Sequence, residues 1–204
     1  MKLYYHPFSA NARRVTMTAE ILGSPVEKVL VDLMKGAHKA PDYLAINPNG
    51  KVPALVDGDL KLWESHAIMV HLSEQSLNQT IWPTDSRIRT EVLRWMFWSA
   101  SHWTPTIGVM LYENVLKANF EKAPPDAARI AKGNADFEVL AKVADAHLDG
   151  RKYLVGDDIT LADISVAAPL MHMESAKFSI EKFAHLKAWF ARIQEHEAWK
   201  KSAT

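Results

Sequence analysis

The chain has 204 residues, of which 48% are hydrophobic and 24% are charged, so it can bury a sizeable core and lacks the charge excess of disordered proteins. Its 24 basic residues equal its 24 acidic residues in number, which argues against nucleic acid or an anionic membrane as a partner and favours a small molecule or a protein. There is no cysteine, and this excludes disulfides, thiolate-bound metals and a cysteine nucleophile.

The first quarter of the chain alternates between strand and helix patterns. Residues 3–5 and 27–31 have the pattern of short strands, and residues 12–22 form an expected helix that Gly23 ends. The opening stretch MKLYYHPFSANARR has no apolar region typical of a secretion signal, and no long apolar run follows. We therefore expect a cytoplasmic protein that begins with a βαβ unit.

A hairpin is expected next. A short helical stretch at residues 41–46 precedes two strand-like segments, 54–56 and 60–63, on either side of the turn Asp57-Gly58-Asp59. A helix over residues 65–75 follows. The order βαβ and then ββα predicts a small mixed sheet with helices packed on it, in a domain over residues 1–77.

No strand pattern returns after the polar segment 78–86, which we interpret as a linker to an all-helical domain over residues 87–204. Thr84 or Asp85 can cap a long helix. One face of that helix, at helical spacing, carries Ile88, Val92, Trp95, Met96 and Ser99. Pro105 is expected to kink or break this helix, because proline lacks the N–H group that a helix interior needs.

A second long helix is expected over residues 126–148. Pro125 precedes it, Gly150 follows it, and two more helices come after it. Thr160 and Asp163 stand three residues apart before an apolar run, which is the pattern of a capping box. We interpret this pair as structural and expect the loss of Asp163 to cost about 1 kcal/mol or more in stability.

Ser9 lies between the end of the first strand and the start of the first helix. Free N–H groups and the positive end of the helix dipole favour an anion there, so a thiolate beside Ser9 would be stabilised. Capping of the helix by Ser9 or Asn11 explains the same residues equally simply.

Two further segments have a possible binding role. Pro53 cannot donate to a sheet, so it belongs at a strand start, and a cis Val52-Pro53 bond would turn the main chain of Val52 outward to pair with an extended peptide. Glu64 and Ser65 follow the last strand, where a helix start can bind a carboxylate and Glu64 can bind the adjacent ammonium group. An ordinary turn proline and a capping serine are the alternatives.

Taken together, these motifs resemble a known family. The series Ser-x-x-x-Arg from Ser9, His38-Lys39, NPNGKVPAL, WES-x-AI and ITLAD resembles the cytosolic glutathione transferases of the serine type, theta- and phi-like, and we expect a bacterial member. The likeness covers the whole chain. It implies a thioredoxin-like N-terminal domain followed by an all-helical C-terminal domain, and a homodimer.

The resemblance also implies site residues. Ser9 would donate its hydroxyl to the sulfur of glutathione, with Tyr5 and Asn11 as alternatives. Val52 and Pro53 would present main chain to the cysteinyl unit, and Glu64 and Ser65 would hold the γ-glutamyl end. Cations suited to the glycine carboxylate are His38, Lys39 and Lys51. An apolar wall for the electrophile would be formed by Phe8, Trp103, Ile107 and Met110.

The function implied is therefore an enzyme that uses glutathione as co-substrate and attacks small hydrophobic electrophiles with its thiolate. Isomerase, dehalogenase or peroxidase chemistry with glutathione is an alternative, and so is a non-catalytic binding or interaction protein of the same fold. No metal is expected, because the nine histidines are scattered and form no ligand pattern.

Overall fold

The computed structural model describes residues 1–202 and divides the chain into two compact units. The first unit contains residues 1–83 and, in addition, residues 196–202, whereas the second contains residues 84–195. The sequence prediction assigned residues 87–204 to the helical domain, whereas residues 196–202 group with the first unit. A contact between segments so far apart in the chain leaves no local pattern in the sequence.

The first unit is a mixed sheet with helices. Its elements are β1 (Lys2–Tyr5), α1 (Ala10–Leu22), β2 (Glu27–Leu30), the 3-10 turn η1 (Ala37–Lys39), α2 (Pro41–Leu44), β3 (Ala54–Asp57), β4 (Leu60–Trp63), α3 (Ser65–Glu74) and α11 (Glu197–Lys201). The strand order is β2-β1-β3-β4, with β1 and β2 parallel and β3 antiparallel to both of its neighbours. The predicted thioredoxin-like βαβ-ββα arrangement is confirmed.

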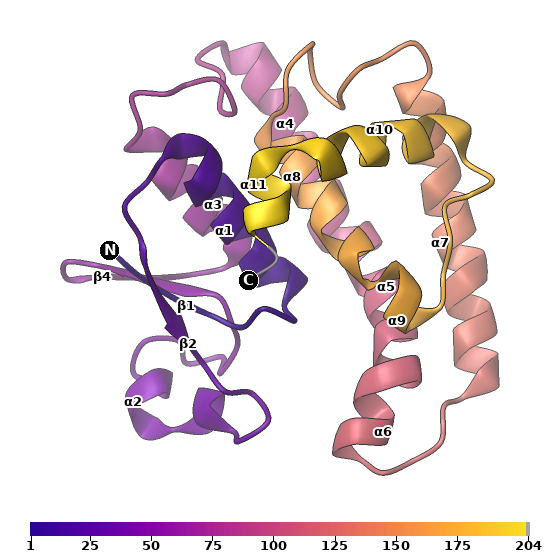
Figure 1. Cartoon of the computed structure of the whole chain (residues 1–204), viewed down its shortest axis with the longest axis horizontal. Coiled ribbons are helices and arrows are strands. Elements are labelled where there is room, and N and C mark those ends of the chain that lie inside the picture. Colours follow the sequence, from indigo (N-terminus) through magenta and orange to yellow (C-terminus); the bar gives the residue numbers. More distant parts are fainter. Residues whose placement is uncertain (203–204) are drawn as a thin grey trace. The chain divides into compact units, whose positions relative to one another are not determined.

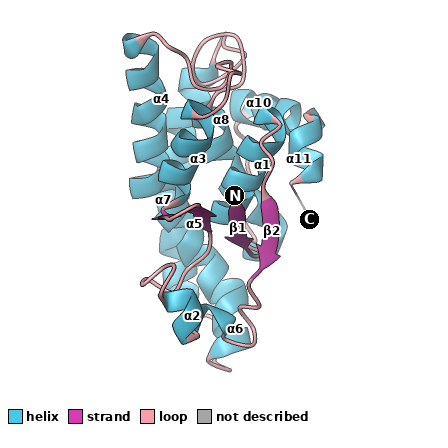
Figure 2. Cartoon of the chain, turned by 90° about the vertical axis from the view of Figure 1, so that its left-hand side faces the viewer, coloured by secondary structure: helices cyan, strands magenta, loops and turns pink. Residues whose placement is uncertain are grey.

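Helix α1 is the buried element of this unit. It lies beside α3 and is contacted by α11 from the other end of the chain, as both views show (Figures 1 and 2). Leu3 of β1 pairs with Leu55 of β3, and both side chains are fully buried. Gly23 ends α1 in the left-handed region at φ 64°, as its position in the sequence predicts.

The second unit is helical throughout. Its elements are α4 (Ser86–Trp98), η2 (Ser99–Trp103), α5 (Thr104–Leu111), η3 (Tyr112–Leu116), α6 (Lys117–Phe120), α7 (Ala127–Leu148), α8 (Leu161–Ala167), η4 (Ala168–His172), α9 (Met173–Ala176) and α10 (Ala184–Glu195). The predicted all-helical domain is confirmed. Within residues 1–202, no helix is both long enough and apolar enough to cross a membrane.

The sequence predicted that Pro105 kinks or breaks its helix, and the structure shows no break at this residue. The π-helical segment η2 directly precedes α5, and the N–H of Thr104 donates to the carbonyl of Ser99. Pro105, which has no N–H group, therefore lies where π-helical hydrogen bonding changes to α-helical hydrogen bonding. The chain therefore stays helical from Ser86 to Phe120. The predicted apolar face begins at Val92, because Ile88 is 43% exposed.

Asp163 anchors the second unit. Its fully buried carboxylate accepts hydrogen bonds from the main-chain N–H of Leu154 and of Thr160 at 2.9 Å, the Thr160 hydroxyl at 3.0 Å and the Trp189 indole at 2.9 Å. Burial raises the pKa of Asp163, and these hydrogen bonds oppose that rise. The predicted capping box is present. The carboxylate also connects α8 to α10 through Trp189 and to the loop that precedes α8 through Leu154.

Replacing Asp163 with Asn tests this anchor. The amide nitrogen is a donor, so at least one of the four donors loses its acceptor, and we expect the free energy of unfolding in urea to fall by about 2 kcal/mol. Asp157→Asn, an exposed change in the same loop, should leave it unchanged. Equal stability of the two variants would contradict the role given to Asp163.

Candidate functional site

Ser9 occupies the N-cap of α1. Its main-chain N–H donates to the carbonyl of His6 at 2.9 Å, which closes the connection from β1, and its Oγ accepts from the N–H of Ala12 at 3.2 Å. The capping interpretation is therefore confirmed. Capping uses the oxygen as an acceptor and leaves the hydroxyl hydrogen available, so Ser9 can cap the helix and donate to an anion at the same time.

The start of α1 is electrostatically positive. No acidic residue lies in its first turn, whereas Arg13 and Arg14 follow directly in α1 and are both buried. Burial lowers the pKa of Arg13 to about 10 and that of Arg14 to about 9, so both guanidinium groups stay protonated at neutral pH. Together with the helix dipole, they favour an anion in front of Ser9.

The two alternatives to Ser9 lie on either side of it. The Oδ1 atom of Asn11 accepts from the Nη1 of Arg14, so part of its amide is already engaged. Tyr5 ends β1, pairs with Leu30 of β2, and its carbonyl accepts from the N–H of Val31 at 2.8 Å. Ser9 alone among the three combines a hydroxyl with the N-cap position.

The loop before β3 presents the main chain of Val52. The carbonyl of Lys51 accepts from the Tyr43 hydroxyl at 2.6 Å and from the Asn47 amide at 2.7 Å, and this fixes the loop. The Val52-Pro53 peptide bond is cis, and the Val52 side chain packs with Tyr43. Within residues 1–202, neither the N–H nor the carbonyl of Val52 has a hydrogen-bond partner.

The three predicted cations lie on two loops that approach each other. His38 and Lys39 end η1, and Lys51 follows Gly50. A Cβ atom on Gly50 would lie 3.1 Å from the carbonyl oxygen of His38, and Gly50 has φ +59°, so glycine permits this approach. The Nδ1 atom of His38 is buried and has no hydrogen-bond partner within the described residues. The arrangement suits a carboxylate.

Glu64 and Ser65 form the junction between β4 and α3. Glu64 has φ 71° and ψ 112°, a strained conformation for a residue with a side chain, and no side chain caps the first N–H groups of α3. Ser65 is buried and Glu64 is exposed. Burial, and then the charge of Arg14, lower the pKa of the adjacent His66 to about 3, so this histidine is neutral.

The apolar wall predicted for an electrophile is largely wrong. Trp103, Ile107 and Met110 are at most 2% exposed. The indole of Trp103 stacks on Phe137 at 4.9 Å and donates to the carbonyl of Val166 at 2.9 Å, so these side chains form the core of the second unit. Large apolar residues on helices are usually core residues, and the spacing alone could not separate the two roles.

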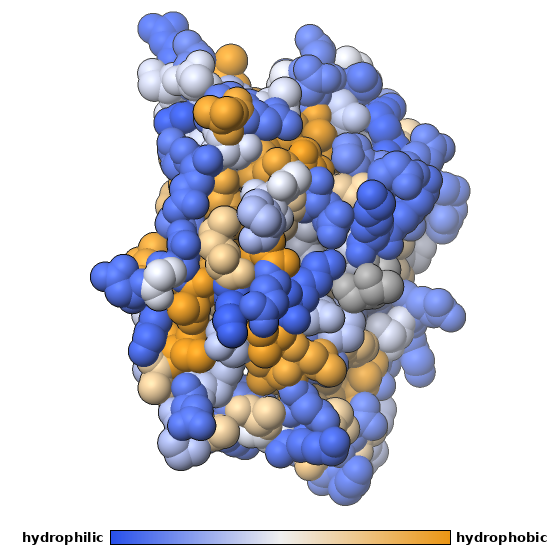
Figure 3. All heavy atoms as spheres, turned by 60° about the vertical axis from the view of Figure 1, so that its left-hand side comes forward, coloured by the Kyte–Doolittle hydropathy of each residue, from blue (hydrophilic) through white to orange (hydrophobic). Residues whose placement is uncertain are grey.

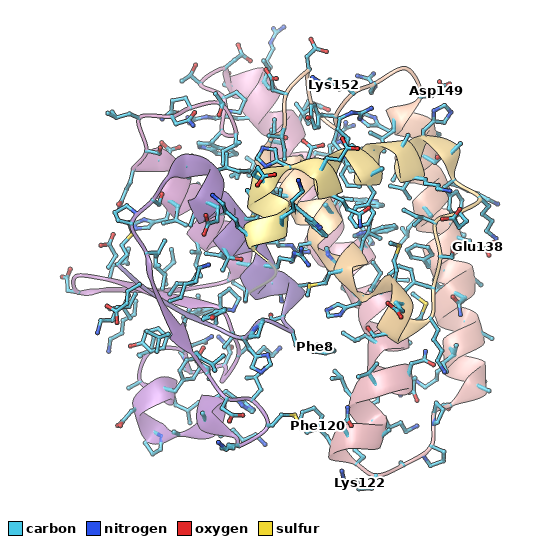
Figure 4. All side chains as sticks on the ribbon, in the orientation of Figure 1. Phe8, Phe120, Lys122, Glu138, Asp149 and Lys152 are labelled. Atoms are coloured by element: carbon cyan, nitrogen blue, oxygen red, sulfur yellow. The ribbon has the colours of Figure 1, made fainter. Side chains whose placement is uncertain are left out.

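Phe8 differs from those three residues because it is 38% exposed. It lies on the connection between β1 and α1 (Figure 4) and directly precedes Ser9 in the sequence. Apolar side chains also reach the surface between charged ones on the face shown in Figure 3. Of the four residues predicted to form the wall, Phe8 is therefore the one whose side chain is exposed.

Sequence reasoning missed the residues that hold Arg13. The Arg13 guanidinium donates to the carbonyl of Trp199 at 2.9 Å and to the hydroxyl of Ser202 at 3.3 Å. No sequence signal links these residues, which are more than 180 positions apart.

In the described residues, no group of three or more His, Cys, Asp or Glu side chains is placed to bind a metal.

Comparison with known proteins places the chain in a family. Residues 1–74 match the glutathione S-transferase N-terminal domain, and residues 110–197 match the glutathione S-transferase C-terminal domain.

Individual proteins are similar along their full length. Probable glutathione S-transferase GSTF2 of Oryza sativa subsp. japonica is 32% identical over 206 residues, which cover 100% of this chain and 96% of that protein. Glutathione S-transferase 3 of Zea mays is 35% identical over 209 residues, covering 99% and 92%. A solved structure of glutathione S-transferase-I bound with lactoylglutathione has a TM-score of 0.87 and 28% identity, covering 99% and 97%. The chain belongs to the glutathione S-transferase family.

Proposed function

We propose that this chain is a glutathione transferase in which the hydroxyl of Ser9 donates a hydrogen bond to the sulfur of bound glutathione. The thiol of glutathione releases its proton to solvent, and the resulting thiolate attacks an electrophilic carbon of a small hydrophobic compound. A C–S bond forms, and the leaving group departs with its electron pair. The observation that carries the proposal is the N-cap geometry of Ser9, which leaves a hydroxyl hydrogen at the positive end of α1.

The energy required is within reach of such a site. A free thiol has a pKa near 8.5, so roughly 3% is ionised at pH 7, and lowering that pKa by about two units requires about 2.7 kcal/mol. A hydrogen bond to a charged group contributes about 1.5–3 kcal/mol, and a helix start adds about 0.3–1 kcal/mol. No general base is needed.

The rest of glutathione would be held along the first unit. Val52, followed by Pro53, pairs its free main chain with the cysteinyl unit, as in strand addition. Glu64 binds the γ-glutamyl ammonium group, while Ser65 and the uncapped N–H groups of α3 bind its carboxylate. The glycine carboxylate faces His38, Lys39 and Lys51. Phe8 contributes apolar contact to the electrophile.

Several finer properties belong to the same proposal. A relative of known structure holds lactoylglutathione, which supports glutathione as the co-substrate here. The family membership supports a cytoplasmic homodimer and a theta- or phi-like subclass. A bacterial source stays a prediction, since the two relatives named above are plant proteins.

The role of Ser9 can be tested by titrating the ultraviolet thiolate absorbance of glutathione from about pH 5 to 9 with the protein. We expect the bound thiol to ionise near pH 6 to 7, about two units below the free thiol, and Ser9→Ala to reverse this shift. Tyr5→Phe should leave the titration unchanged. If Tyr5→Phe alone reverses the shift, the thiolate is stabilised by Tyr5. Absence of glutathione binding to the unaltered protein would make a non-catalytic relative the better reading.

Glu64 allows stability and binding to be separated. Glu64→Gly should relieve the strain at φ 71° and raise the free energy of unfolding by about 1 kcal/mol, because glycine has no Cβ. Glutathione affinity should fall about tenfold through loss of the carboxylate. Glu64→Ala should show the same loss of affinity without the gain in stability. Unchanged affinity in both variants would remove Glu64 from the site.

Lys51 can be tested with a shortened ligand. Lys51→Ala should weaken glutathione binding about three- to tenfold, as measured by calorimetry, because one exposed cation facing the glycine carboxylate is lost. The same substitution should have no effect on γ-glutamylcysteine, which has no glycine. Lys2→Ala, an exposed lysine on β1, serves as the control. An equal loss for both ligands would show that Lys51 does not face the glycine carboxylate.

A further inference from the structure

Helix α11 and its C-cap residue Ser202 contact the side chain of Arg13. The guanidinium carbon lies 3.7 Å from the centroid of the Trp199 ring, and the same group donates to the Trp199 carbonyl and the Ser202 hydroxyl. Arg13 is 9% exposed, Trp199 is 7% exposed and Ser202 is 4% exposed. These three residues form what we call the Arg13 clamp, and Figures 1 and 2 both show α11 beside α1.

Within the described residues, the Arg13 clamp holds a cation without pairing it with an anion. All three partners of the guanidinium are electrically neutral, and within residues 1–202 no carboxylate is paired with Arg13. A buried charge is screened less than an exposed one, so its field extends further into its surroundings.

The position of Arg13 relates this charge to Ser9. The N–H of Arg13 donates to the carbonyl of Ser9 at 2.9 Å in the first turn of α1, so the two residues lie one turn apart. Side chains on a helix lean toward its N-terminal end. A fixed guanidinium at this position therefore adds to the positive field of the helix start.

We propose that Trp199 and Ser202 are positioning residues that hold Arg13 so that its charge stabilises the glutathione thiolate at Ser9. This inference rests on the proposed function and adds to it a role for the end of the chain. Trp199 and Ser202 lie after residue 197, where the match to the C-terminal domain of the family ends.

Other charged groups around α1 are constant in the test. Arg14 lies next in α1, and the neutral His66 lies in α3. On α11, Glu197 pairs with Lys200 at 2.7 Å, and Lys201 and His196 are the other titratable groups between residues 196 and 202. Because none of them is altered, a change in thiol ionisation can be assigned to the Arg13 clamp.

The experiment compares charge-removing and charge-preserving variants by the pH titration of thiolate absorbance in bound glutathione. Arg13→Gln should raise the pKa of the bound thiol by about 0.5–1 unit, whereas Arg13→Lys should raise it by less than about half as much. Trp199→Ala should raise it as well, because the guanidinium loses its ring contact. Trp199→Phe should keep the wild-type value, since an aromatic face remains. Arg87→Gln removes an exposed arginine elsewhere and should change nothing.

The outcomes separate the two proposals. If the unaltered protein fails to ionise glutathione, the proposed function fails and the Arg13 clamp loses its role with it. If the unaltered protein ionises glutathione and Arg13→Gln leaves the thiol pKa unchanged, the clamp proposal alone is overturned. Equal shifts in Arg13→Gln and Arg13→Lys would also overturn it, because they would indicate a structural effect. Should Arg13→Gln not fold by circular dichroism, Trp199→Ala against Trp199→Phe decides by the same criterion.

Discussion

The first unit is organised around two guanidinium groups that helix α1 buries in succession. Removing an ion from water costs several kcal/mol, and hydrogen bonds must offset that cost. Arg14 lies against Asn11 in its own helix, and its charge helps to keep His66 of α3 neutral. Within residues 1–202, the hydrogen-bond acceptors of the Arg13 side chain are Trp199 and Ser202. The need to satisfy these cations therefore explains why the end of the chain packs with the first unit, and why the start of α1 is positive where Ser9 lies.

The second unit follows the same rule with the opposite sign. Asp163 is an anion held by four neutral donors, and Glu113 is a buried anion held by Lys117 at 3.0 Å and by the N–H of Asp126 at 2.9 Å. Asp163 joins α8 to α10 and to the preceding loop, and Glu113 joins its own helix to the start of α7, so each charge fixes more than one element. Such groups specify how helices meet, whereas apolar packing such as Trp103 on Phe137 supplies the bulk of the buried area.

Local patterns predicted those features that local residues determine. Gly23 and Asp126 mark helix ends, and the turn at Asp57-Gly58 joins two strands. The capping box of Thr160 and Asp163 spans four consecutive residues. Each of these features could therefore be predicted from the sequence. Long-range features could not be read in this way. Residues 196–202 group with the first unit, where they contact Arg13. Pro105 follows a π-helical turn, and no spacing of residues in the sequence predicts such a turn. Trp103 was misassigned because an apolar helix face suits a core and a ligand wall equally well.

The proposed site depends on main chain and helix ends more than on reactive side chains, and this explains its signature in the sequence. Ser9 contributes one hydroxyl, Val52 contributes a free N–H and carbonyl, and α3 contributes uncapped N–H groups. Any residue type has a main chain, so single positions carry little information, and each motif taken alone is ambiguous. What the sequence does contain is the residues that shape that main chain, such as Gly50, which approaches His38, and Asn47, whose amide donates to the carbonyl of Lys51. The joint pattern is therefore specific because several loops must each present their backbone to one ligand.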